Sequence, residues 1–63
     1  MKTRVPGDVI FEYVQVGHSV RVTAIHAATG TEVTVQAPLT LSSKEMQTLA
    51  MRKLNYVMAK EKK

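Results

Sequence analysis

The order of the hydrophobic patterns is the feature that most constrains this chain: three runs of alternating apolar residues come first, and one amphipathic helical pattern follows. The runs cover residues 9–16, 19–26 and 31–37, and the helical pattern covers residues 43–60. Apolar residues at every second position indicate strands with one buried face, whereas a period near 3.6 indicates a helix. The order predicts an α+β domain, a three-stranded antiparallel β-meander followed by one C-terminal α-helix packed on one sheet face.

The chain is short enough to form only one domain. We expect residues 1–63 to fold as one unit, with a flexible N-terminal segment over residues 1–8 and a basic tail over residues 61–63. A chain of this length buries only about 60% of the surface that its unfolded form exposes, so its stability is small. Because the chain has no cysteine, neither a disulfide nor a thiolate metal site can add stability. A partner subunit is the remaining common support for so small a domain.

The first two strands are predicted to form a hairpin with a fixed register. Only residues 17–18, Gly followed by His, separate the two runs. Gly at the first central position of a two-residue connection favours a type II′ turn. With Val16 opposite Ser19, Phe11 lies opposite Ala24, so large apolar residues on one face find apolar partners.

The second connection, residues 27–30, is predicted to be a four-residue loop that ends in Gly30 in the left-handed conformation. That loop places Val33 opposite Ala24, whereas a three-residue bulged loop would place Val33 opposite Ile25. We favour the four-residue loop because it gathers the valine-rich positions on one face. The helix-facing side of the sheet then holds Phe11, Tyr13, Val20, Val22, Ala24, Val33, Val35 and Ala37.

The predicted helix has a clear beginning and one apolar stripe. Pro38 cannot donate to a sheet ladder, so we expect the third strand to end near Ala37. Ser42 and Glu45 have the spacing of a capping box, in which each side chain binds a free backbone N–H of the first turn. The core stripe consists of Met46, Ala50, Leu54 and Val57, with Leu49 and Tyr56 on one flank and Met51 and Met58 on the other.

Apolar side chains outnumber the positions that one helix on one sheet can cover. The apolar arc of the helix is wider than the about 100° that covers a sheet, and the second sheet face carries apolar residues among polar ones. The alternative interpretation is that antiparallel sheets tolerate scattered β-branched residues in water. We predict a small non-enzymatic protein-association module that forms a homodimer. The candidate interface residues, on the second face or on the methionine flank, are Ile10, Val14, Val16, Ile25, Met51 and Met58.

The positive charge of the chain provides a second hypothesis. Nine Lys and Arg against five Asp and Glu give a net charge of +4, with most of the excess near the two ends. The candidate contacts to nucleic-acid phosphates are Lys44, Arg52 and Lys53, which could bind without reading bases. A sheet that enters the major groove needs Arg and Lys on its outer face, where this sequence has Arg21 alone. Nucleic-acid binding is therefore the alternative to protein association.

No residue pattern in the sequence indicates catalysis, a metal or a cofactor. His18 and His26 stand at opposite ends of one predicted strand, about 26 Å apart, which is too far to share a metal ion. Capping explains the serines before the helix, and residues 29–31 lack the glycine pattern of a phosphate-binding loop. We expect no catalytic residue, no metal site and no cofactor.

The sequence also bears on the compartment. The first residues lack the apolar stretch of a signal peptide, and no run approaches the about 18 apolar residues that cross a bilayer. We therefore expect a cytoplasmic protein with no membrane contact.

Four stretches, residues 7–14, 20–25, 28–33 and 49–57, are specific as a set, although each is common alone. Together they resemble a family of short uncharacterised bacterial proteins, a domain of unknown function. The resemblance covers nearly the whole chain and implies a self-contained protein, with no established activity to carry over. Some members bear an automatic serine hydroxymethyltransferase label, but that enzyme needs a pyridoxal phosphate lysine inside a large domain, and 63 residues cannot build such a pocket.

Overall fold

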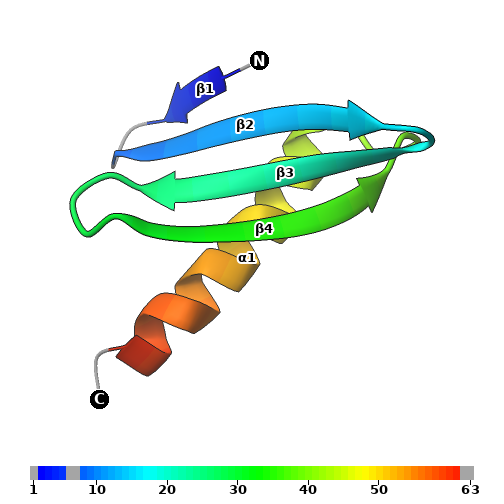
Figure 1. Ribbon diagram of the computed structural model, residues 1–63. Helices are drawn as coiled ribbons and strands as arrows, with labels where there is room; N and C mark the ends of the chain where they lie inside the picture. Colours follow the sequence, from blue (N-terminus) through cyan, green and yellow to red (C-terminus); the bar gives the residue numbers. More distant parts are fainter. Residues whose placement is uncertain (1, 6–7, 62–63) are drawn as a thin grey trace.

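The computed structural model describes the backbone of residues 2–5 and the backbone and side chains of residues 8–61. Its elements in chain order are β1 (Lys2–Val5), β2 (Val9–Val16), β3 (Ser19–His26), β4 (Thr31–Pro38) and α1 (Ser43–Glu61). The strands form one antiparallel sheet in the order β1-β2-β3-β4, and α1 crosses one face of it (Figure 1). The predicted α+β fold is confirmed, because β2, β3, β4 and α1 are the three-stranded meander and the C-terminal helix.

The sheet has one strand more than the sequence indicated. We expected a flexible segment over residues 1–8, but β1 pairs with β2, with Lys2 opposite Glu12 and Val5 opposite Val9. Hydrophobic periodicity could not reveal this strand, because four residues are too few for a pattern and the pairing uses backbone groups. β1 reaches only as far as Glu12 along β2, so it covers half of that strand's outer edge.

Both predicted hairpin registers are confirmed. Val16 lies opposite Ser19 in the first hairpin, and Val33 lies opposite Ala24 in the second. Gly17 has a φ of 61° and is followed by a residue without positive φ, as in a type II′ turn. Gly30 has a φ of 75°, which is the left-handed conformation that the four-residue loop requires.

The third strand of the meander, β4, ends at Pro38, one residue beyond the predicted end. Ladder bonds alternate along an antiparallel pair, and the residues that flank a two-residue turn form a hydrogen-bonded pair. Counting from Val16 and Ser19, the residues of β4 that bond to β3 are Thr31, Val33, Val35 and Ala37. The ring nitrogen of Pro38 therefore points away from β3, and the ladder loses no donor.

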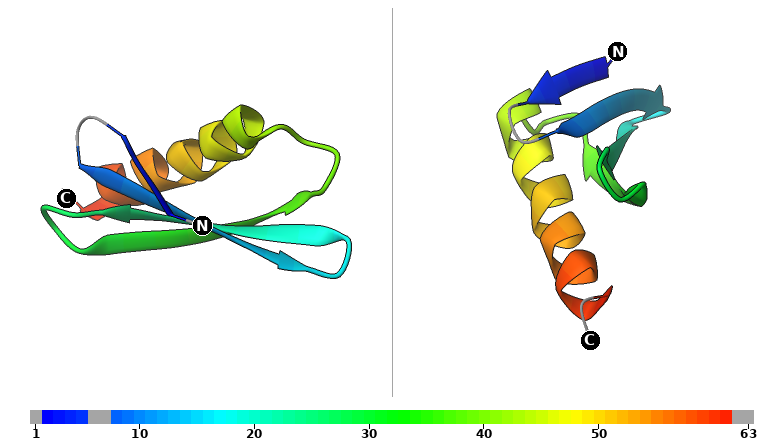
Figure 2. Two further views of the ribbon diagram at one scale, coloured as in Figure 1. Left: turned by 90° about the horizontal axis from the view of Figure 1, so that it is seen from above. Right: turned by 90° about the vertical axis from the view of Figure 1, so that its left-hand side faces the viewer.

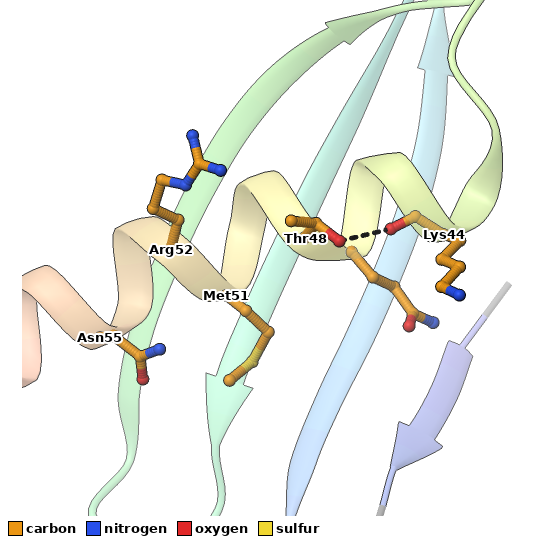
Figure 3. Close-up of a pocket in the computed structure, with 6 residues that line it drawn as sticks. Lys44, Thr48, Met51, Arg52 and Asn55 are labelled. Atoms are coloured by element: carbon orange, nitrogen blue, oxygen red, sulfur yellow. Dashed lines mark hydrogen bonds between the residues drawn. The ribbon is translucent and has the colours of Figure 1, made fainter.

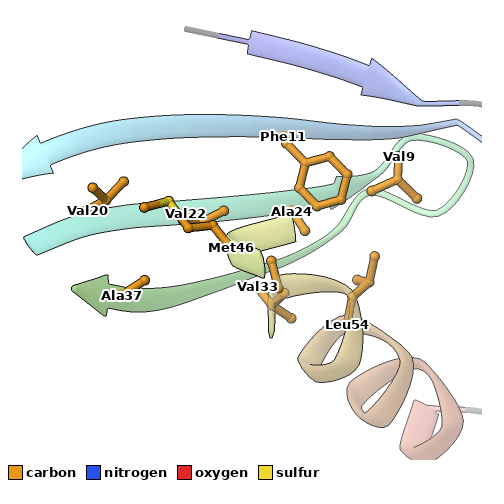
Figure 4. Packing of buried hydrophobic residues seen from close by; sticks show 10 residues of the cluster. Val9, Phe11, Val20, Val22, Ala24, Val33, Ala37, Met46 and Leu54 are labelled. Carbon is orange, nitrogen blue, oxygen red and sulfur yellow. The ribbon is translucent and has the colours of Figure 1, made fainter. Parts of the chain in front are cut away.

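The core lies between α1 and the sheet, as Figure 4 shows. The side chains of Phe11, Val22 and Leu54 are the largest that are fully buried. Of the predicted core residues, Tyr13, Val35 and Val57 are only half-buried and pack against this cluster. The buried residues are Val9, Phe11, Val20, Val22, Ala24, Val33, Ala37, Met46, Ala50 and Leu54.

The helix begins at the predicted capping box and lies obliquely across the sheet. Glu45 Oε1 accepts a hydrogen bond of 2.8 Å from the Ser42 N–H, and Ser42 Oγ accepts one of 3.1 Å from the Glu45 N–H. α1 packs mainly on β3 and β4, and its C-terminal half extends past β4 (Figures 1 and 2). Its last turn is tied to β4 by a hydrogen bond of 3.1 Å from Thr31 Oγ1 to Glu61 Oε1. The helix thus includes residue 61 of the predicted basic tail, and residues 62–63 lie outside the described residues.

Candidate association surface

The face of the sheet opposite α1, which we name the open face, has no described element packed on it (Figure 2). The exposed fraction is 55% for Val14 and 50% for Val16, the two residues at the end of β2. Ile10 and Ile25 lie opposite each other across β2 and β3 and are half-buried. The described residues of the open face are Ile10, Glu12, Val14, Val16, Ser19, Arg21, Thr23, Ile25, Glu32, Thr34, Gln36 and Pro38.

The structure separates the two halves of the predicted interface. The four residues of β2 and β3 share the open face, whereas Met51 and Met58 lie on α1 at the other side of the sheet. Both methionines are partly buried against the core cluster, so much of their apolar surface is already used within one copy. Only Val14 and Val16 among the six candidates present half or more of their surface to solvent.

Two exposed apolar side chains lie elsewhere in the described part of the chain. Tyr56 on α1 is 62% exposed, and Leu39 in the loop after β4 is 43% exposed. The Lys60 ammonium lies over the Tyr56 ring, 5.0 Å from its centre, in a cation–π contact. The helical wheel placed Tyr56 on the flank of the stripe, but it could not show that α1 extends past β4 there.

A groove that the sequence did not indicate lies beside the end of β2. Its volume is about 270 Å³, and Tyr13, Gln15, Val20, Ser43 and Met46 line it. The Tyr13 hydroxyl is buried there and has no hydrogen-bond partner among the described residues. The alternating sequence pattern placed Tyr13 on the core side of the sheet. It could not show which atoms of α1 would lie near the Tyr13 hydroxyl, and so it could not show that the hydroxyl has no hydrogen-bond partner among the described residues.

The predicted phosphate contacts do not all lie together. Lys44 and Arg52 line a shallow depression of about 450 Å³ on the surface of α1, with Met51 between them (Figure 3). Lys53 instead donates a hydrogen bond of 3.0 Å from Nζ to the Thr34 carbonyl of β4. Lys53 therefore covers a strand edge, which leaves Lys44 and Arg52 of the three candidates beside this depression.

The two histidines have separate surroundings. His18 is exposed in the first turn, whereas His26 Nδ1 lies 2.9 Å from Thr29 Oγ1. Thr29 Oγ1 lies 2.8 Å from Thr31 Oγ1, which continues the chain of hydrogen bonds to Glu61. These contacts hold the loop of the second hairpin to the end of α1. Over residues 8–61, no group of three or more His, Asp or Glu side chains has the arrangement of a metal site.

One comparison with known proteins identifies the family. The family described as Domain of unknown function (DUF6898) matches residues 6–61, which is nearly the entire chain. The chain belongs to the DUF6898 family. A search of curated proteins and a search of solved structures returned no match. The DUF6898 description supplies no activity, so the function must be inferred from the surfaces described above. No helix in the described part of the chain is long and apolar enough to cross a membrane.

Proposed function

We propose that this DUF6898 protein is a non-enzymatic protein-association module that forms a homodimer through the open face. The observation that carries the proposal is the half exposure of Val14 and Val16 on a face that α1 does not cover. Ile10 and Ile25 form a second apolar pair on the same face, separated from Val14 and Val16 by the cross-strand pair of Glu12 and Thr23. Clustered apolar residues on an open sheet face are typical of protein interfaces, whereas a single exposed valine is not.

The polar residues of the open face are compatible with a second copy. Arg21 lies between Val14 and Gln36 in the sheet register, and Glu32 lies at the far end of β4. The face thus carries both signs of charge, so two copies can be turned to bring Arg21 of each near an acidic residue of the other. Thr23 and Thr34 already bond to each other, with 3.2 Å between their hydroxyl oxygens, and do not need a partner.

The test of this proposal is the mass of the protein in solution. Light scattering coupled to size exclusion should report about twice the monomer mass of 7.0 kDa, with the fraction of dimer rising over a concentration series. Val14→Lys should shift the protein toward monomer, because the ammonium would be removed from water in the interface. Asn55→Lys adds the same charge at an exposed position on α1 and is the matched control. A mass of 7.0 kDa at every concentration would refute the proposal.

A second candidate function is contact with nucleic-acid phosphates, supported by Lys44 and Arg52 in the same depression. If α1 binds phosphates, Arg52→Ala should weaken a gel shift with labelled DNA at low salt. Lys53→Ala should have little effect, because its ammonium is bound to the Thr34 carbonyl. The absence of any shift at low salt would exclude this function.

A further inference from the structure

The end of β2, residues 13–16, has an outer backbone edge with which no described residue pairs. The turn flanked by Val16 and Ser19 sets the alternation of the ladder, so Val14 and Val16 bond to β3 while the N–H and C=O of Gln15 point to the outer edge. β1 pairs no further than Glu12, so no described residue lies opposite Gln15 on that side. The side chain of Gln15 donates a hydrogen bond of 3.2 Å from Nε2 to the Gly17 carbonyl, within the same turn.

The opposite edge of the sheet is protected, and this edge is not. On β4, Lys53 Nζ donates a hydrogen bond to the Thr34 carbonyl, and the strand ends in a proline. Lysine and proline are common devices that prevent edge strands from pairing with other chains. Residues 13–16 contain no charged residue and no proline, and they include the two exposed valines. Among the described residues, the end of β2 is therefore a position at which the sheet can accept an added strand.

We propose that the second copy joins here, with the end of its β2 antiparallel to the end of this β2 and Gln15 opposite Gln15. This inference rests on the proposed homodimer and gives it an edge-paired geometry, in which Val14 and Val16 of the two copies are neighbours on the open face without one face covering the other. The register places Val14 of each copy opposite Val16 of the other, on the open face. It brings no like charges together, since the paired segment is uncharged, and it keeps the second copy clear of the four residues of β2 that β1 covers.

The same register places a side chain of the second copy beside the groove at the end of β2. Gln15 of the second copy would lie diagonally opposite Tyr13 on the side of the sheet that α1 covers, and diagonal neighbours are within reach of long side chains. The Tyr13 hydroxyl is already buried within one copy, so this glutamine would contact the Tyr13 side chain at the rim of the groove and would not bond to the hydroxyl. The residue pair is symmetric, so both copies gain the same contact.

The size of the paired segment predicts a weak dimer. Stable interfaces use about 20–30 residues per partner, far more than residues 13–16 and their neighbours supply. The association should therefore be measured over a range of about 10 μM to about 1 mM, within which a transient dimer of this size dissociates.

Gln15→Pro tests the proposal, with Gln36→Pro as its matched control. Both replace a glutamine whose N–H points away from β3, so neither removes a bond of the β2–β3–β4 ladder. Gln15→Pro should raise the dissociation constant of the dimer by at least about tenfold, because the proline removes a donor and blocks the edge. Gln36→Pro, on the protected edge, should leave the dissociation constant within about twofold of the native value.

Hydrogen exchange of the native chain gives a second measurement that does not depend on the variants folding. The Gln15 amide should exchange more slowly as protein concentration rises if the β2 edges pair. If the native protein dimerises but Gln15 exchange is independent of concentration and Gln15→Pro still dimerises, edge pairing is wrong and the open face remains the interface. If the native protein is monomeric throughout, both proposals are wrong.

Discussion

Replacing Val14 by Lys is the sharpest test of the apolar surface, because its effect can be worked out from burial. About half of the Val14 side chain remains for a partner to cover, since its exposed fraction is 55%. Full burial of a valine contributes about 1.5–3 kcal/mol, so the two copies of Val14 in a symmetric dimer together contribute about that amount. A factor of ten in affinity corresponds to about 1.4 kcal/mol. Loss of both valine contacts should therefore weaken the dimer by about tenfold to a hundredfold.

The lysine adds a further penalty of the same sign. Two ammonium groups would lie near each other across the symmetric contact, where like charges oppose association. Sedimentation equilibrium over a dilution series measures the dissociation constant, and circular dichroism checks that the variant keeps its fold. Since the new ammonium would lie opposite Arg21 across β2 and β3, the substitution should also lower the free energy of unfolding by up to about 1 kcal/mol, which the circular dichroism measurement takes into account.

The control and the refuting result are both defined by the structure. Asn55→Lys carries the same added charge on the outer surface of α1, so it measures the effect of net charge alone. If Val14→Lys dimerises as tightly as Asn55→Lys, the exposed valines do not form the interface. The half exposure of Val14 would then no longer support an interface on the open face.

Three further predictions concern stability and are checked by urea unfolding followed by circular dichroism. Leu54→Ala removes a side chain that is 1% exposed and should lower the free energy of unfolding by about 2–5 kcal/mol, enough to unfold much of so small a protein; an effect below about 1 kcal/mol would contradict the described core. Ser42→Ala removes the acceptor for the Glu45 N–H and should lower the unfolding free energy by about 1 kcal/mol, whereas Ser43→Ala, the neighbouring control, should change it by less. Gly30→Ala should lower it by about 1 kcal/mol through backbone strain alone, because φ is 75° and no atom lies within 4 Å of the added Cβ.

The parts of the fold that could be predicted are those specified by local chemistry. A glycine before a histidine determined the first turn, and the turn then determined the whole β2–β3 register. The capping box located the start of α1 to the residue, because its two side chains must bond to each other's backbone. These signals lie within a few residues of the structure that they specify.

The parts that could not be predicted depend on where distant elements meet. β1 is held by backbone pairing to β2, which leaves no mark in the side-chain pattern of residues 2–5. Lys53 was a candidate phosphate contact together with Lys44 and Arg52, but the oblique crossing of α1 brings its ammonium to the edge of β4. The same crossing buries part of Met51 and Met58, which the wheel left as candidates for an interface.

The short length of β1 connects the architecture of the sheet to its proposed assembly. A strand of four residues on a strand of eight leaves half of the β2 edge without a described neighbour. The uncovered half is the segment that carries the two most exposed valines of the described chain. A longer β1 would pair with the edge at Gln15 and remove the site for a second copy, while Val14 and Val16 would remain on the open face. Extending β1 by design would therefore abolish an edge-paired dimer and leave a face-to-face dimer intact, so the two geometries make opposite predictions for one change.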